Sequence, residues 1–390
     1  MSPVNRRNFL KTTGLATLPA LVANPVLAMG TGYKQSPPAI PLIKFYGDGE
    51  MFEPIDYLNI LQQANTTTGI VKDAYGAGGS VEALEKKFAE ITGKEKAVYM
   101  PSGTMANQLA IAVLSGENSK VFVQDTSHVY RDEADAAQSV FQKRLMPLAK
   151  DEPFFTAQQL QSAVEALPSE EVFKTGVGAV SIENPVRRSN GRMVPVEELR
   201  KISTYCRTNN IKLHLDGARI YMASAWSGVS IKEYASLCDT IYISLYKYFG
   251  AAGGAMLCGD KAVIDKMPHL IKVHGGTMYG NWANAAMALY RLEGFETRLK
   301  NTLQKAHELF DALNKMTGIT IKALPGGTNM YSFALSTSIN GKKLRDTLNK
   351  TYNIRIGGFN DKNEGLLTVN ETLLYKDNNY IINAFKKSTE

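Results

Sequence analysis

Two short apolar segments of this chain each run into an ionisable residue. Ile211–Leu215 is followed directly by Asp216, and Ile241–Leu245 is followed two positions on by Lys247, 31 residues after the acid. Apolar runs of this length are typical of strands buried on both faces of a parallel sheet. Parallel strands end at one edge of their sheet, where open α/β sheets bind ligands, so the pattern predicts a carboxylate and an amine in one crevice.

A carboxylate and a lysine in one crevice are the pair that pyridoxal phosphate requires. A lysine holds this cofactor as a Schiff base, and an acid keeps the ring nitrogen protonated so that the ring can act as an electron sink. Either residue alone has a simpler explanation, because an Asp at a strand end commonly caps the next helix and a Lys in a loop is usually solvated. Together, Lys247 and Asp216 favour a pyridoxal phosphate site.

A third segment adds a candidate anion site upstream. Ala97–Met100 is typical of a short strand, and it leads through a turn of small residues into an apolar helical pattern over Leu109–Leu114. Free N–H groups at a helix start, the helix dipole and nearby hydroxyls all favour a bound anion. Alone, the turn would indicate an ordinary capped helix. Beside the acid and the lysine, it predicts a phosphate cradle at Ser102, Gly103 and Thr104.

Three motifs in this order resemble the threonine aldolase and β-eliminating lyase family. They are P-S-G-T-M-A-N-Q at 101–108, H-x-D-G-A-R at 214–219, and S-L-x-K followed by a Gly-rich segment, together at 244–254. The likeness extends from about Ile43 to the C-terminus. It implies the aspartate-aminotransferase-like α/β fold of pyridoxal phosphate enzymes (fold type I), in which a mostly parallel sheet is sandwiched by helices.

The same resemblance assigns further residues to the site. His128 matches the family's histidine that stacks on the cofactor ring, where an imidazole can also move a proton. Arg219 matches an arginine at the cofactor and substrate site, and Asn184 matches a residue of the pocket. Lys272 matches a basic residue near the phosphate.

The chain departs from the family at two positions that bind the substrate carboxylate and at one on the phosphate side. The family's early serine aligns with Gly47, its C-terminal arginine aligns with Leu366, and an arginine on the phosphate side is replaced by Tyr279. A bidentate arginine fixes a carboxylate in distance and angle, which leucine cannot do. Either another arginine takes over, or the substrate is not a simple α-amino acid held in the usual way. The candidates are Arg355, which we place first, Arg187 and Arg188.

The resemblance implies a lyase that acts on an amino acid. The first hypothesis is aldol cleavage of a β-hydroxy-α-amino acid to glycine and an aldehyde. Lys247 and Asp216 would serve the cofactor, and His128, or a water that it positions, would act as the base. The alternative within the family is β-elimination or another lyase reaction. A third hypothesis is a binding protein with this fold and no turnover, which the missing arginine favours and the retained cofactor residues disfavour.

Strand and helix patterns alternate along most of the chain, which indicates a largely parallel sheet covered by helices. We predict a large cofactor-binding domain at 43–290 and a smaller α/β domain at 291–390, with a long helical region over 282–316. The strands expected in the large domain are 97–100, 121–123, 178–182, 211–215, 241–245 and 254–257. The helices expected between them lie near 156–166, 196–208 and 230–236, and the later strands near 319–323, 330–335 and 366–369.

The N-terminus has the pattern of an export signal. The pair Arg6-Arg7 precedes a short apolar stretch, Leu15–Val26, and a small-residue cleavage site at Ala28. The apolar stretch is too short, and too interrupted by proline, to span a membrane. We predict a twin-arginine signal peptide at 1–28, a flexible leader at 29–42, and a mature periplasmic protein without membrane attachment.

Composition argues against several other classes of function. The net charge of +7 includes three cations of the predicted signal, and the remaining +4 is too weak and dispersed for nucleic-acid binding. Three cysteines (Cys206, Cys238 and Cys258) are scattered among apolar neighbours, and the histidines lack metal-ligand spacing, so we predict neither disulfides nor a metal. Members of the family are usually dimers or tetramers, so the resemblance implies a homo-oligomer.

Overall fold

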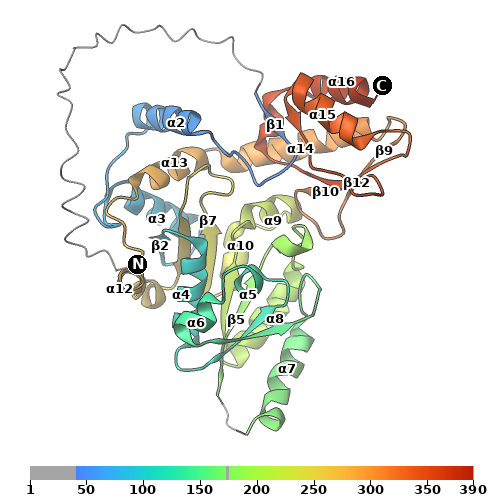
Figure 1. The fold of residues 1–390 in the computed structure, drawn as a ribbon. Helices are drawn as coiled ribbons and strands as arrows, with labels where there is room; N and C mark the ends of the chain where they lie inside the picture. The colour runs from blue at the N-terminus through green and yellow to red at the C-terminus, as the bar shows by residue number, and fades with distance from the viewer. Residues whose placement is uncertain (1–40, 173–174, 390) are drawn as a thin grey trace, which may run out of the picture. The chain divides into compact units, whose positions relative to one another are not determined.

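The structure, a computed structural model, describes residues 41–172 and 175–389 of the 390-residue chain (Figure 1). The predicted signal at 1–28 and nearly all of the predicted leader at 29–42 lie outside the described residues, so both stay predictions. Residues from Pro41 onward form one compact unit. In the part of the chain that the structure describes, no helix is long and apolar enough to cross a membrane.

A seven-stranded sheet forms the centre of the fold. Its strands are β2 (Lys96–Met100), β3 (Lys120–Gln124), β4 (Arg144–Leu148), β5 (Val177–Glu183), β6 (Lys212–Asp216), β7 (Thr240–Ser244) and β8 (Ala255–Gly259). In space they follow the order β2-β8-β7-β6-β5-β3-β4. Neighbouring strands pair in parallel except at β8, which runs antiparallel to both β2 and β7. The prediction of a mostly parallel sheet is confirmed.

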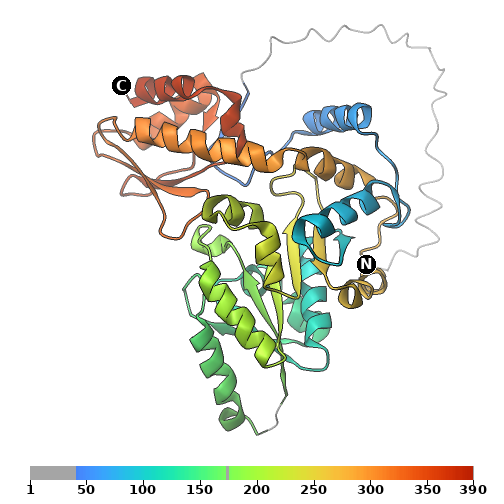
Figure 2. The same cartoon turned by 180° about the vertical axis from the view of Figure 1, so that it is seen from behind.

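Helices cover both faces of this sheet (Figures 1 and 2). They are α3 (Gly79–Thr92), α4 (Gly103–Ser115), α5 (His128–Arg131), α6 (Ala136–Phe141), α7 (Ala157–Glu170), α8 (Val196–Thr208), α9 (Ile220–Ser227), α10 (Ile231–Ser236), α11 (Lys261–Ile264) and α12 (Met267–Val273). Helix α2 (Pro54–Thr67) precedes them in the chain and lies away from the sheet (Figure 1). Because side chains alternate along a strand, β7 reaches both layers. Ile241 and Ile243 join the apolar cluster of α3, α8 and α10, whereas Tyr242 joins that of α4 and α12.

The strand ends bring the predicted site residues to one edge of the sheet. β6 and β7 pair in parallel with Asp216 opposite Tyr242, so this acid lies beside the turn that carries Lys247. β5 flanks β6 on its other side and places Glu183 opposite Asp216. Helix α4 begins at the same edge, directly after β2. The crevice predicted from the two apolar segments is therefore present.

The C-terminal part builds a second apolar core. Helices α13 (Trp282–Leu292) and α14 (Phe295–Leu313) replace the single long helical region predicted over 282–316, because the chain turns between them at Gly294, whose φ is 65°. An antiparallel sheet follows, in the order β12-β10-β9. The elements of this part are β9 (Ile319–Ala323), β10 (Met330–Leu335), α15 (Gly341–Tyr352), β12 (Glu364–Thr368), the 3-10 turn η2 (Glu371–Tyr375) and α16 (Asn378–Thr389).

The first described strand belongs to this C-terminal core. β1 (Ile43–Lys44) pairs in parallel with β11 (Ile354–Arg355), and both Ile43 and Phe45 are buried in the C-terminal apolar cluster. The chain then leaves this core and reaches α2, far from it in the fold. The predicted domain boundary after residue 290 stays a prediction, to which the packing adds that Ile43 and Phe45 contribute to the second core.

Candidate active site

A cavity lies at the carboxyl ends of β5, β6 and β7, under the start of α4. Every predicted site residue except Asn184 and Lys272 contributes to its lining. The lining residues are Ser102, Gly103, Thr104, His128, Glu133, Glu183, Asp216, Ala218, Arg219, Tyr242, Tyr246 and Lys247. Side chains from segments far apart in the sequence thus meet in one place.

Lys247 is partly buried, and its amine has no fixed ionic partner among the described residues. Its Nζ lies 6.0 Å from the ring centroid of Tyr242 and 5.6 Å from that of Tyr246. Within residues 41–172 and 175–389, no carboxylate lies within ion-pair distance of it. Burial, followed by the charge of Arg219, lowers the pKa of Lys247 to about 8. Roughly a tenth of the amine is then neutral, and hence nucleophilic, at pH 7.

Asp216 is held by hydrogen bonds to both of its carboxylate oxygens. The backbone N–H of Ala218 donates to Oδ1 at 3.1 Å, and Asn107 Nδ2 donates to Oδ2 at 2.9 Å. The side chain is almost completely buried. The carboxylate is therefore fixed at the floor of the cavity, beside the turn that carries Lys247.

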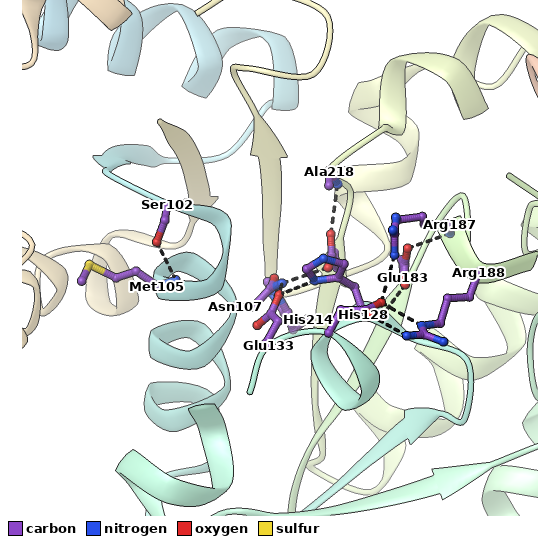
Figure 3. Close-up of polar contacts among 12 residues, drawn as sticks. Ser102, Met105, Asn107, His128, Glu133, Glu183, Arg187, Arg188, His214 and Ala218 are labelled. Atoms are coloured by element: carbon purple, nitrogen blue, oxygen red, sulfur yellow. Dashed lines mark hydrogen bonds and ion pairs between the residues drawn. The ribbon is translucent and has the colours of Figure 1, made fainter. Parts of the chain in front are cut away.

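Asn107 is in turn oriented by a buried histidine (Figure 3). Burial lowers the pKa of His214 to about 4, so its ring is neutral at physiological pH. His214 Nε2 lies 3.0 Å from Asn107 Oδ1, which can only accept, so this nitrogen carries the proton. His214 Nδ1, 2.8 Å from Thr240 Oγ1, must then accept from the hydroxyl. This chain turns the NH₂ group of Asn107 toward Asp216.

His128 is positioned through Glu133, which also contacts Asn107 (Figure 3). Glu133 Oε1 lies 2.8 Å from His128 Nδ1 and accepts from Asn107 Nδ2 at 2.7 Å. The hydrogen bond to Glu133 raises the pKa of His128, although partial burial opposes the shift. Asn107 therefore links the acid at the cavity floor to the histidine in its wall. The motif that contains Asn107 was recognised in the sequence, but this link needs the folded register.

Glu183 is a buried carboxyl that sequence reasoning did not single out. Its Oε2 accepts from the backbone N–H of His128 at 2.6 Å, and its Oε1 accepts from that of Arg187 at 2.8 Å. Burial, followed by the charge of Asp216, raises the pKa of Glu183 to about 7. Its position directly after the predicted strand 178–182 was the available signal.

The start of α4 provides donors for an anion. Ser102 caps the helix by accepting from the backbone N–H of Met105 at 3.3 Å, and the first-turn N–H groups have no carbonyl partner within the helix. Gly103 is required by packing, since a Cβ at this position would lie 2.1 Å from the hydroxyl oxygen of Tyr242. Thr104 adds a hydroxyl-bearing side chain to the lining.

Arg219 connects this cavity to a second one. Its Nε and Nη2 donate to Asp48 Oδ1 and Oδ2 at 2.5 and 2.9 Å. The second cavity, of about 510 Å³, shares Arg219 with the first. It is lined by Gly47, Asp48, Asp132, Arg187, Arg188, Asn190, Gly191, Arg219, Asn329, Met330 and Thr368.

Two predicted residues lie outside the Lys247 cavity. Lys272 lines a separate cavity, where its Nζ lies 5.6 Å from the ring centroid of Tyr75. Asn184 is buried, and its Oδ1 accepts from the backbone N–H of Val194 at 2.9 Å, which ties down the loop after β5. Their roles toward a cofactor stay predictions. Among the described residues, no group of three or more His, Cys, Asp and Glu side chains is arranged to hold a metal ion.

The donor set of the Lys247 cavity fits pyridoxal phosphate. A partly buried amine that has no ion-pair partner in the part of the chain that the structure describes suits attachment of the aldehyde, and Asp216 offers a fixed carboxylate to a protonated ring nitrogen. His128 offers a flat ring in the wall, and the start of α4 offers donors to a phosphate. Fold and cavity together define a class: the chain is a fold type I enzyme of the kind that uses pyridoxal phosphate.

Comparison with known proteins identifies the family within this class of enzymes. The sequence profile described as "Beta-eliminating lyase" matches residues 60–335. A low-specificity L-threonine aldolase of Candida albicans is 31% identical over 278 residues, which cover 70% of this chain and 73% of that protein. The alanine racemase TOXG of Cochliobolus carbonum is 32% identical over 238 residues, or 60% of each chain. The chain belongs to the beta-eliminating lyase family, which confirms the resemblance seen in its motifs.

Solved structures agree on the fold. A crystal structure from Exiguobacterium sp. 255-15, with a provisional assignment as an aromatic amino acid beta-eliminating lyase/threonine aldolase, superposes with a TM-score of 0.75. The two sequences are 24% identical, and the match covers 90% of this chain and 97% of that one. At this identity the likeness shows the fold alone.

Proposed function

We propose that this protein uses pyridoxal phosphate to cleave a β-hydroxy-α-amino acid into glycine and an aldehyde. The observation that carries the proposal is the meeting of Lys247, Asp216 and His128 in one cavity of a family lyase. The relative named as a low-specificity L-threonine aldolase favours aldol cleavage over β-elimination. The cofactor, once bound, supplies an electron sink for the charge left on Cα when the Cα–Cβ bond breaks.

Different residues of the chain hold the cofactor, orient its ring and line the cavity. Lys247 holds the cofactor through its amine, and Asp216 keeps the ring nitrogen protonated through a carboxylate that Asn107 orients. Arg219 and the start of α4 also line this cavity. Asp216 and Arg219 are held by hydrogen bonds before substrate arrives, so these two groups need little reorganisation during the reaction.

His128 is our candidate for the group that takes the proton of the β-hydroxyl. When its Nδ1–H donates to Glu133, its Nε2 is left as the acceptor that a base requires. The imidazole must be neutral to act in this way. Activity is therefore expected to fall as the pH drops through the raised pKa of His128.

The test is a product assay on the purified protein supplied with pyridoxal phosphate. L-threonine and L-allo-threonine should each yield glycine and acetaldehyde in equal amounts. Pyruvate from β-chloroalanine without any aldehyde product would move the assignment to β-elimination. Exchange between L- and D-alanine as the main activity would favour the chemistry of the racemase relative. No turnover of any of these substrates would support the binding-protein hypothesis.

We also propose export and self-association, which rest on separate observations. The order of Arg6-Arg7, an apolar stretch and Ala28 supports export by the twin-arginine route to the periplasm. Family resemblance supports a homodimer or homotetramer, and the large exposed side chains of Ile55 and Leu58 on α2 suit a covered surface. Light scattering of the mature protein gives the mass that tests self-association.

A further inference from the structure

The second cavity, which adjoins the Lys247 cavity through Arg219, carries an excess of positive charge. Its lining contains three arginines and two aspartates. Arg219 is paired with Asp48 through both carboxylate oxygens, so these two side chains neutralise each other. The remaining charge imbalance lies on Arg187 and Arg188.

Arg187 and Arg188 share a single carboxylate. Arg187 Nη1 donates to Asp132 Oδ2 at 3.1 Å. Arg188 Nε and Nη2 donate to Asp132 Oδ2 and Oδ1 at 2.9 and 2.6 Å. Both guanidinium groups are about half exposed, with side-chain accessibilities of 51% and 46%, so each keeps donors that Asp132 does not use. Two guanidiniums on one carboxylate leave room for a second anion.

The loop that carries the two arginines is fixed at both ends. Glu183, which binds the backbone N–H of His128, also binds that of Arg187. At the other end, the backbone N–H and Oγ1 of Thr328 both donate to the carbonyl oxygen of Gly191, at 3.1 and 2.8 Å. Hydrogen bonds at both ends therefore hold the loop that carries Arg187 and Arg188, which lowers the entropic cost of binding an anion.

One of the departures from the family lies at this cavity. Gly47, which stands at the position of the family's early serine, lines it, and so does Thr368 on β12. Leu366, at the position of the family's arginine, lies two residues earlier on the same strand and lines a separate cavity, which shares Asn190 with this one. Arg355, our first candidate for a replacement, lies on β11, where its Nε donates to Asn349 Oδ1 at 2.9 Å, and it lines neither cavity.

We propose that Arg187 and Arg188 bind the α-carboxylate of the substrate. The carboxylate clamp would then lie on the loop after β5 and not on β12, and Asp132 would hold the two guanidiniums in place until an anion arrives. This inference rests on the proposed use of amino acid substrates, but it does not depend on which bond is cleaved. Its consequence for specificity is that an amine without a carboxylate binds poorly.

The experiment compares two ligands that differ in the carboxylate alone. The cofactor-loaded protein is titrated with glycine and with 2-aminoethanol, and binding is followed by the change in visible absorption. The wild-type protein should bind glycine more tightly. The double variant R187Q/R188Q should lose roughly ten- to hundredfold in affinity for glycine, the range for charge-assisted pairs that are partly exposed. Its affinity for 2-aminoethanol should not change.

The matched control is R200Q. Arg200 is a similarly exposed arginine on α8 that pairs with Glu197 on the same helix and with Glu233 on α10, and its removal should leave both affinities unchanged. If the double variant does not fold, the single variants R187Q and R188Q each retain one partner for Asp132 and should give intermediate losses. Unchanged glycine binding, or equal losses for both ligands, would overturn the proposal. Carboxylate-dependent glycine binding without aldol cleavage would instead refute the proposed function alone.

Discussion

Lys247 illustrates how burial sets reactivity at the residue scale. Its lowered pKa of about 8 predicts that the cofactor-free protein captures pyridoxal phosphate faster as the pH rises toward 8, because only the neutral amine attacks the aldehyde. The rate should climb about tenfold per pH unit below 8 and then level off. Visible absorption after mixing measures it, with Lys247→Ala as the control that captures nothing. A rise that continues past pH 10 would contradict the argument.

The contact between Glu133 and His128 predicts a shift in the pH dependence of activity. The negative charge of Glu133 stabilises the imidazolium, so Glu133→Gln should lower the pKa of His128. If neutral His128 is the base, the acid limb of kcat/KM for threonine should move to lower pH. Glu197→Gln, on the surface of α8, is the matched control and should leave the profile in place. If the acid limb of the kcat/KM profile does not move in Glu133→Gln, His128 is not the base.

Individual site residues differ in how far the sequence reveals them. Lys247 and Asp216 follow apolar strands, so their meeting could be predicted from the alternation of elements alone. Asn107, His214 and Glu133 act through hydrogen bonds between three separate elements, and no local pattern encodes that register. The sequence placed Arg355 before Arg187 as a replacement for the family's arginine, and only the fold shows that Arg187 lines the cavity beside Arg219 whereas Arg355 does not.

At the scale of elements, the start of α4 is the most constrained feature. An alanine at Gly103 would place its Cβ 2.1 Å from the Tyr242 hydroxyl, so either the helix start or the ring must move. We expect Gly103→Ala to cost roughly 1–3 kcal/mol of stability and to weaken cofactor binding. Thermal unfolding and cofactor titration measure both effects. Gly253→Ala is the control, since its Cβ would have no heavy atom closer than 3.7 Å.

Elements with an uninterrupted apolar periodicity were predicted well. Elements that contain a proline or span only two residues were not. Helix α8 and strands β9 and β10 have the predicted bounds because their apolar periodicity is uninterrupted. Strand β4 was not predicted, since Pro147 lies within it. A proline is tolerated there because β4 is an edge strand that pairs only with β3. The two-residue strand β1 is too short to be seen in sequence without its partner.

At the scale of the whole molecule, the proposed twin-arginine signal implies an order of folding and transport. Proteins on the twin-arginine route cross the membrane already folded, so the substitution of Arg6 and Arg7 by Lys should leave a stable, cofactor-loaded protein in the cytoplasm. Cell fractionation and N-terminal sequencing measure the outcome. Wild-type protein found wholly in the cytoplasm, with its first residues intact, would contradict the prediction.

The pairing of β1 with β11 sets a time order during synthesis. The segment after β1 carries Asp48, which pairs with Arg219, and Gly49, whose Cβ position lies 3.1 Å from the Cα of Tyr248. Until the ribosome has made Ile354, β1 has no strand to pair with, and this segment is not anchored beside the cavity. The segment at Ile43 and Lys44 therefore cannot take its final position until Ile354 and Arg355 have been made. A nascent chain can therefore form its central sheet before the segment that carries Asp48 and Gly49 is anchored by the pairing of β1 with β11.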